Sequence, residues 1–181
     1  MRSFISIEFP ENIKKEIFKT FESLKNSGTA FGNFVKKENM HLTLKFLGNL
    51  SEEKIKEIKK KLCEVNFKTF NTDVGNIGFF PSEKYVRVIW VDLISEKIKG
   101  LKKTIDDKLH EIGINHDGRE FSSHITVARI KKMKNKEDFF KKIKELKIKK
   151  MNFEINDFFL IKSELRKDGP VYKIIKKFEL N

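Results

Sequence analysis

The chain has 181 residues, of which 39% are hydrophobic and 36% are charged, and its formal net charge is +13 at pH 7. This length and composition predict a globular protein, either one sizeable domain or two small lobes that share a core. No apolar run approaches the roughly 20 residues that a membrane-spanning helix needs, and the single cysteine, Cys63, excludes an internal disulfide. The first ten residues carry Glu8 inside their only apolar stretch, so they predict a strand rather than a signal peptide, and we expect a cytoplasmic protein.

The net charge favours a polyanionic partner, because neutralising phosphates releases their counterions and drives nucleic-acid binding. Only five of the 39 basic residues are arginines, however, so lysine supplies most of the charge. A lysine-rich chain can also reflect genome composition or heat adaptation, with the lysines lining the solvated sides of helices. The charge therefore leaves RNA binding and a merely solvated lysine surface as alternatives.

The first half of the chain predicts alternating strands and helices. Hydrophobic periodicity and turn residues indicate, in order, a strand over 2–9, a helix from Pro10 to about Lys25, a loop over 26–33, a strand from His41 to Gly48, a helix capped by Ser51 and a strand over 67–80. A turn is expected at Pro81-Ser-Glu.

The second half repeats the theme. The pattern predicts a strand over 85–93, a helix that begins after Ser95 and stops at Gly113, a polar turn over 115–120, a strand from His124, a helix over 136–146, a strand over 152–162, a turn at Asp168-Gly-Pro and a last strand over 171–180. No linker separates the halves. Residues 1–181 are therefore expected to form a single α+β domain of two pseudo-symmetric lobes, each a mostly antiparallel sheet backed by helices.

Two similar tetrads are the most informative feature of the sequence: His41-Leu-Thr-Leu returns as His124-Ile-Thr-Val, 124 − 41 = 83 residues later, about half the chain. Alternate side chains of a strand share a face, so each tetrad presents one imidazole and one hydroxyl on the same side. The other two histidines, His110 and His116, lack this frame and are predicted to be solvated. The bland alternative is that both tetrads are strands whose polar face meets solvent.

Two imidazoles facing each other across a cleft can act as base and acid around one phosphorus atom. Thr43 and Thr126 can donate hydroxyl hydrogen bonds to the phosphate oxygens. Arg129 could add a charge-assisted bond, but strict alternation puts it on the wrong face unless the strand ends or bulges near Ala128.

Other side chains near the tetrads give weaker predictions. Lys45 shares the face of His41 and could attract an RNA backbone, or could be one more solvated lysine. Phe46 is predicted to belong to the core rather than to a base-stacking platform. A His-x-Thr pair offers one good ligand per strand, so we expect neither a metal site nor a cofactor.

The chain resembles the 2H phosphoesterase superfamily, and within it the RNA 2′,3′-cyclic phosphodiesterases also called 2′-5′ RNA ligases. The resemblance covers the opening Arg-Ser-Phe-Ile-Ser-Ile-Glu-Phe-Pro, the two tetrads with their continuations Lys-Phe-Leu-Gly and Ala-Arg, the Val-Arg-Val-Ile-Trp strand, and Gly-Pro-Val-Tyr near the end. The residue before the second histidine is often proline in this family and is Ser123 here.

The resemblance implies a bilobal fold around a central cleft, a monomer, and metal-free hydrolysis of RNA 2′,3′-cyclic phosphate ends to 2′-phosphate ends. It implies that His41 donates a proton to the leaving 3′ oxygen, that His124 accepts one from water, and that the two threonines and Arg129 hold the phosphate. Joining of tRNA fragments through 2′-5′ bonds is the side reaction it implies. The alternatives are a 2H enzyme acting on another phosphodiester, such as a 2′-5′ oligonucleotide or a nucleotide cyclic phosphate, and a non-catalytic RNA-binding module.

Overall fold

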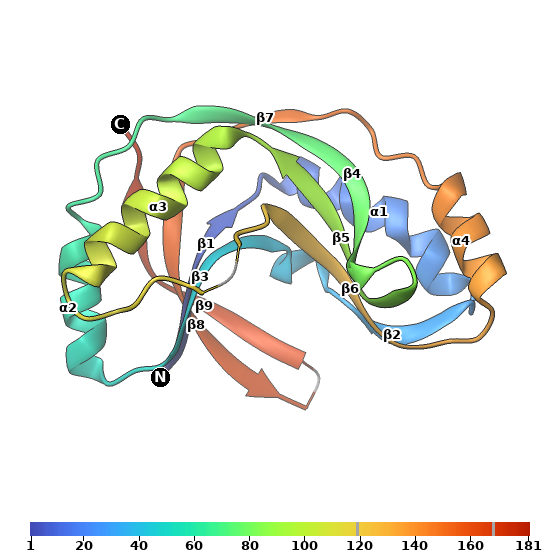
Figure 1. Cartoon of the computed structure of the whole chain (residues 1–181), viewed down its shortest axis with the longest axis horizontal. Coiled ribbons are helices and arrows are strands. Elements are labelled where there is room, and N and C mark those ends of the chain that lie inside the picture. Colours follow the sequence, from blue (N-terminus) through green and yellow to red (C-terminus); the bar gives the residue numbers. More distant parts are fainter. Residues whose placement is uncertain (119, 168) are drawn as a thin grey trace.

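The computed structural model describes residues 1–118, 120–167 and 169–181. Within these residues the chain forms a nine-stranded, curled sheet with helices on its outer side (Figure 1). The strand order is β7-β4-β5-β6-β3-β1-β8-β9, with β2 paired to β6, and every pairing found is antiparallel. The expected α+β class is confirmed.

The elements of the first half follow the hydrophobic pattern of the sequence. They are β1 (Arg2–Glu8), α1 (Glu11–Asn26), β2 (Ala30–Phe34), the short 3-10 helix η1 (Lys37–Asn39), β3 (His41–Asn49), α2 (Glu52–Leu62) and β4 (Phe70–Ser82). Ser51 caps α2, because its hydroxyl accepts a hydrogen bond from the backbone N–H of Lys54 at 3.2 Å. The predicted stripe of Ile55, Ile58 and Leu62 is buried.

The second half continues with β5 (Tyr85–Ile94), α3 (Glu96–His110), β6 (His124–Met133), α4 (Lys136–Glu145), β7 (Asn152–Ile155), β8 (Asp157–Arg166) and β9 (Gly169–Glu179). Gly113 follows α3 with a φ of 78°, the left-handed conformation that glycine adopts most easily after a helix. Strands β8 and β9 form a hairpin whose far end projects from the body of the protein (Figure 1).

The helices lie in two groups, one against each half of the sheet. Helix α2 contacts α3, and α1 contacts α4, so that each group draws one helix from each half of the chain (Figure 1). The apolar faces of these helices and of the sheet form one continuous core. Within the described residues, no helix is long and apolar enough to cross a membrane.

The two expected sheets are in fact one, because β3 and β6 meet through a single residue pair, Leu42 with Ile125. Both side chains of this pair are fully buried. Elsewhere the same edge of β6 pairs with β2, from Ala30↔Met133 to Phe34↔Ala128. The pairing between β3 and β6 is thus limited to one residue of each strand, and both residues belong to the tetrads.

Three local expectations differ from the structure. Strand β2 lies in the stretch predicted as a loop, because five residues with Gly32 at their centre give no clear alternation. Strand β4 runs through Pro81 to Ser82, and the predicted strand over 152–162 is interrupted at Asn156 between β7 and β8. The predicted turn at Asp168 falls on a residue outside the described part of the chain.

Candidate active site

The two tetrads flank the only residue pair that joins β3 to β6 in the described chain. Leu42 lies opposite Ile125 in an antiparallel register, so one step along each strand sets His41 opposite Thr126 and Thr43 opposite His124. These four residues are partly buried, and they occupy the face opposite the core pair. The fold therefore brings the two histidines and the two threonines together as one paired group.

Each imidazole is held in the same way by the backbone two residues before it. Nδ1 of His41 lies 2.8 Å from the carbonyl oxygen of Asn39, and Nδ1 of His124 lies 2.8 Å from that of Ser122. A carbonyl only accepts, so Nδ1 carries the hydrogen in both rings, and in the neutral form Nε2 holds the free lone pair. The Thr43 hydroxyl lies 3.0 Å from Nε2 of His41 and donates to it.

Aromatic rings surround both imidazoles and restrict their orientation. Phe4 stacks on His41 with ring centroids 4.8 Å apart, and Tyr172 meets the same imidazole edge-on at 5.2 Å. Phe80 meets His124 edge-on at 5.0 Å, and the Trp90 ring lies at 6.0 Å. Trp90 lies over Gly78, where a Cβ atom would be only 2.1 Å from Cζ2 of the indole.

Burial lowers the pKa of both histidines. Desolvation disfavours the imidazolium and lowers the pKa of His41 from 6.5 to about 4, an effect to which the positive charges of Lys14, His124 and Arg129 add. Desolvation also lowers the pKa of His124, with a further contribution from Arg129. In the free protein both rings are therefore neutral at pH 7.

We expect this burial to make the fold sensitive to acid. Between pH 6.5 and about 4 the unfolded chain binds a proton at His41 that the folded protein does not, so stability falls as the pH falls through this window. The loss is at most about 1.4 kcal/mol per pH unit for one such group. Urea unfolding at pH 7.5 and pH 5 measures this loss of unfolding free energy.

The free energy of unfolding of His41→Asn should depend less on pH than that of wild type. An equal pH dependence in the two proteins would contradict the expectation. His110→Asn, at an exposed position of α3, controls for loss of a histidine as such.

Arg129 lies on the same face of β6 as His124 and Thr126 because this strand bulges. The register with β5 passes from Trp90↔Thr126 to Ile89↔Ala128, which leaves Val127 as the extra residue, and both Val127 and Ala128 are buried. Arg129 therefore returns to the exposed side, where its charge lowers the pKa of both His41 and His124. The bulge that the sequence required for Arg129 to reach the site is present.

The prediction that Lys45 meets an RNA backbone is wrong. Strand β3 has a bulge at the matching position, since its pairing with β1 passes from Ser6↔Thr43 to Ile5↔Lys45 and leaves Leu44 as the extra residue. Lys45 therefore turns inward, is only 2% exposed, and forms an ion pair with Asp106 at 3.0 Å.

The assignment of Phe46 to the core is also wrong, because the same bulge returns Phe46 to the surface, where it is 66% exposed. Phe46 follows His41 by five residues, as Arg129 follows His124.

Sequence reasoning also missed four residues of the site: Phe4, Phe80, Trp90 and Tyr172. The strands of all four were recognised, but nothing in the sequence indicates that their rings meet the histidines.

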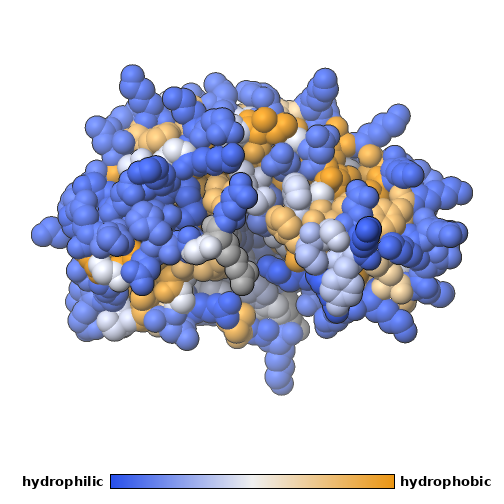
Figure 2. Space-filling model, in the orientation of Figure 1, coloured by the Kyte–Doolittle hydropathy of each residue, from blue (hydrophilic) through white to orange (hydrophobic). Residues whose placement is uncertain are grey.

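The molecular surface is mixed in character. Figure 2 shows, from the side of Figure 1, hydrophilic side chains over most of the face, with smaller apolar patches between them.

Comparison with known proteins places this arrangement in a family. The model of the family described as LigT like Phosphoesterase matches the chain twice, over residues 7–90 and 91–172, so each match contains one tetrad. A protein of Methanocaldococcus jannaschii named RNA 2′,3′-cyclic phosphodiesterase is 37% identical over 179 residues, which cover 98% of this chain and all of that protein. A protein of Archaeoglobus fulgidus with the same name is 34% identical and covers 99% of this chain and all of its own length.

Solved structures share the fold. A Thermus thermophilus protein superposes with a TM-score of 0.80 at 23% identity, and Escherichia coli LigT complexed with 3′-AMP superposes with a TM-score of 0.79 at 22% identity. In both cases the match covers 99% of this chain and 97% of the other. The chain belongs to the LigT-like phosphoesterase family.

Proposed function

We propose that the protein hydrolyses RNA 2′,3′-cyclic phosphate ends to 2′-phosphate ends. The observation that carries the proposal is the pair of His-x-Thr strands joined at Leu42 and Ile125, with each imidazole oriented by a carbonyl two residues upstream. Relatives that are 34 to 37% identical over nearly the whole chain are named RNA 2′,3′-cyclic phosphodiesterase, which supports the same substrate.

The reaction is an in-line displacement at phosphorus. His124 takes a proton from the attacking water through Nε2, the P–O3′ bond breaks, and His41 gives its proton to the departing 3′ oxygen through Nε2. Thr43, Thr126 and Arg129 stabilise the charge on the remaining phosphate oxygens. If a 5′-hydroxyl replaces water, the same displacement forms a 2′-5′ bond, and we propose this joining of RNA fragments as a side reaction.

The low pKa of His41 sets the order of events. A donor must be protonated, yet burial keeps His41 neutral at pH 7 in the free protein. A bound phosphodiester brings a negative charge that favours the imidazolium. His41 therefore takes up its proton together with the substrate.

The remaining parts of the proposal concern the whole molecule. We propose a single domain of two pseudo-symmetric lobes, as the two matches of the family model over 7–90 and 91–172 suggest. We propose that the protein acts as a monomer and that it works in the cytoplasm. The exposed ring of Phe46 offers a surface on which a base of the RNA can stack.

The test uses the purified protein, EDTA, and a short RNA that ends in a 2′,3′-cyclic phosphate. We expect a 2′-phosphate product, identified by mass and phosphatase sensitivity, at a rate that EDTA leaves unchanged. A 3′-phosphate product would contradict the leaving-group assignment, and loss of activity in EDTA would contradict the metal-free mechanism. A panel with a 2′-5′-linked dinucleotide and cyclic mononucleotides separates this function from that of a related enzyme with another substrate. An RNA that binds but never reacts would favour the binding module.

A further inference from the structure

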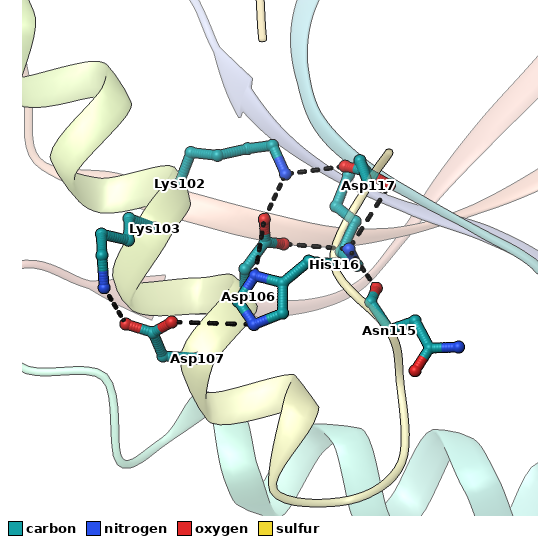
Figure 3. Close-up of polar contacts among 8 residues, drawn as sticks. Lys102, Lys103, Asp106, Asp107, Asn115, His116 and Asp117 are labelled. Atoms are coloured by element: carbon teal, nitrogen blue, oxygen red, sulfur yellow. Dashed lines mark hydrogen bonds and ion pairs between the residues drawn. The ribbon is translucent and has the colours of Figure 1, made fainter. Parts of the chain in front are cut away.

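A group of four charged residues lies under the site and takes no part in the proposed chemistry. Lys102 and Asp106 of α3 meet Asp117 of the loop before β6 (Figure 3), and Lys45 of β3 pairs with both aspartates. We call this group the ion cluster. Nζ of Lys102 lies 2.5 Å from Oδ2 of Asp106 and 2.7 Å from Oδ2 of Asp117, and Nζ of Lys45 lies 3.0 Å from Oδ1 of Asp106.

The ion cluster is neutral overall and largely buried. Lys45 is 2% exposed, and Lys102 and Asp106 are each 6% exposed. Desolvating charged groups is costly, and well-packed apolar residues often give equal or better stability. The role of such a group is therefore better explained by specificity than by stability: it holds β3, α3 and the loop before β6 in one relative arrangement.

One side of the ion cluster holds the loop that leads to His124. Nζ of Lys45 donates to the carbonyl oxygen of Asn115 at 2.9 Å and lies 3.4 Å from Oδ1 of Asp117, in the same loop. Nζ of Lys102 lies 5.8 Å from the centroid of the Phe121 ring. The next residue, Ser122, supplies the carbonyl that accepts the hydrogen bond of His124.

The other side of the ion cluster is the strand of His41. Lys45 follows Thr43 by two residues, and the Thr43 hydroxyl donates to Nε2 of His41. The inward turn of Lys45 comes from the bulge at Leu44. Strands β3 and β6 share only one residue pair, so the ladder alone fixes their relative position poorly. The ion cluster adds a second connection, between β3 and the loop that leads to β6.

We infer that the ion cluster positions His124 relative to His41, by tying the loop that carries Asn115, Asp117 and Ser122 to Lys45 of the His41 strand. This inference rests on the proposed function for its kinetic consequence. Its structural consequence, the placement of the His124 ring, does not depend on that function. Lys45, Lys102 and Asp117 are positioning residues, because they act through the backbone of the loop and the strand.

Asp117→Asn is the test variant, because the Asp117 side chain is 42% exposed. When the charge of Asp117 is lost, Asp106 still pairs with both Lys45 and Lys102. We expect kcat on an RNA 2′,3′-cyclic phosphate to fall by about tenfold or more, since a misplacement of about 1 Å can cost 10²-fold in rate. We expect KM to stay within about twofold. The matched control is Glu96→Gln, which removes an exposed partner of Lys99 from the same helix and should leave kcat unchanged.

A second readout needs no turnover. NMR titration of His124 in the free protein should show a higher pKa in Asp117→Asn than in wild type, because a loosened loop admits water to a ring whose pKa burial lowers. The charged groups that act on this ring, Arg129 and Asp92, are the same in both proteins. A folded Asp117→Asn with the wild-type titration and kcat would overturn the inference.

Variants of Lys45 complete the experiment. Lys45→Met should lower kcat as Asp117→Asn does, and Lys45→Arg should recover part of the rate because it keeps the charge. If the two residues act as one unit, Lys45→Met/Asp117→Asn should be no slower than the worse single variant. Full additivity of the two losses would contradict a shared role. If wild type proved inactive on cyclic phosphates, the proposed function would fail, and the His124 titration alone would still decide the inference.

Discussion

Replacement of either histidine of the pair by alanine is expected to abolish most turnover while leaving the fold and RNA binding in place. A general acid or base contributes about 10²- to 10⁴-fold, so His41→Ala and His124→Ala should each lower kcat on an RNA 2′,3′-cyclic phosphate by at least about 10²-fold. Both rings lie on the partly exposed face of the sheet, so their loss opens no cavity in the core. Single-turnover rates and circular dichroism measure the two effects separately.

His110→Ala is the matched control, because His110 is exposed on α3 and lies outside the paired group. The double variant His41→Ala/His124→Ala should lose far less than the product of the two single losses, since acid and base serve one displacement. A single variant that keeps its rate within a few fold would remove that histidine from the mechanism. Unchanged RNA binding by all three variants would show that the histidines act on the reaction rather than on affinity.

The sequence alone predicted the parts of this site that depend on local pattern. Each tetrad has apolar residues on alternate positions, and such a pattern specifies both a strand and the face of its polar residues. The 83-residue spacing between the tetrads, about half the chain, also indicated that the two strands occupy equivalent positions in a repeated unit. His41, Thr43, His124 and Thr126 could therefore be placed on matching faces before any contact was known.

The errors in the site come from contacts between residues far apart in the chain. Lys45 is buried because Asp106 and Asp117, more than 60 residues later, neutralise it, and no local pattern encodes that encounter. The bulges at Leu44 and Val127 depend on register with neighbouring strands, so strict alternation misplaced Phe46 and left Arg129 conditional. The rings against the imidazoles belong to other strands and were missed for the same reason.

Strands β3 and β6 are similar in backbone and different in chemistry. Both tetrads bulge at their fourth residue, and both histidines donate to the carbonyl two residues upstream. After the bulge, however, β3 has buried Lys45 and exposed Phe46, whereas β6 has buried Ala128 and exposed Arg129. The two similar strands thus present an aromatic ring on one side and a cation on the other.

Arg129→Ala is therefore expected to produce the second large loss, about 10²-fold in kcat/KM, which is the usual effect of removing one donor to a charge that develops in the transition state. Arg129→Lys should recover part of this loss, because it keeps the charge without the bidentate geometry. Arg87→Ala is the control, since Arg87 is an exposed arginine of β5 that bonds to the backbone of Lys131 and to Tyr85.

The same variant should change the histidines of the free protein. Burial is the main cause of the low pKa of His41 and of His124, and the charge of Arg129 adds to it in both. Removing that charge favours the imidazolium, so both rings should titrate at a higher pH in Arg129→Ala than in wild type. NMR titration of the two histidines measures the shift. If Arg129→Ala reacted as fast as wild type and left both titrations unchanged, Arg129 would be a surface residue, and the phosphate would have to be held by the two threonines alone.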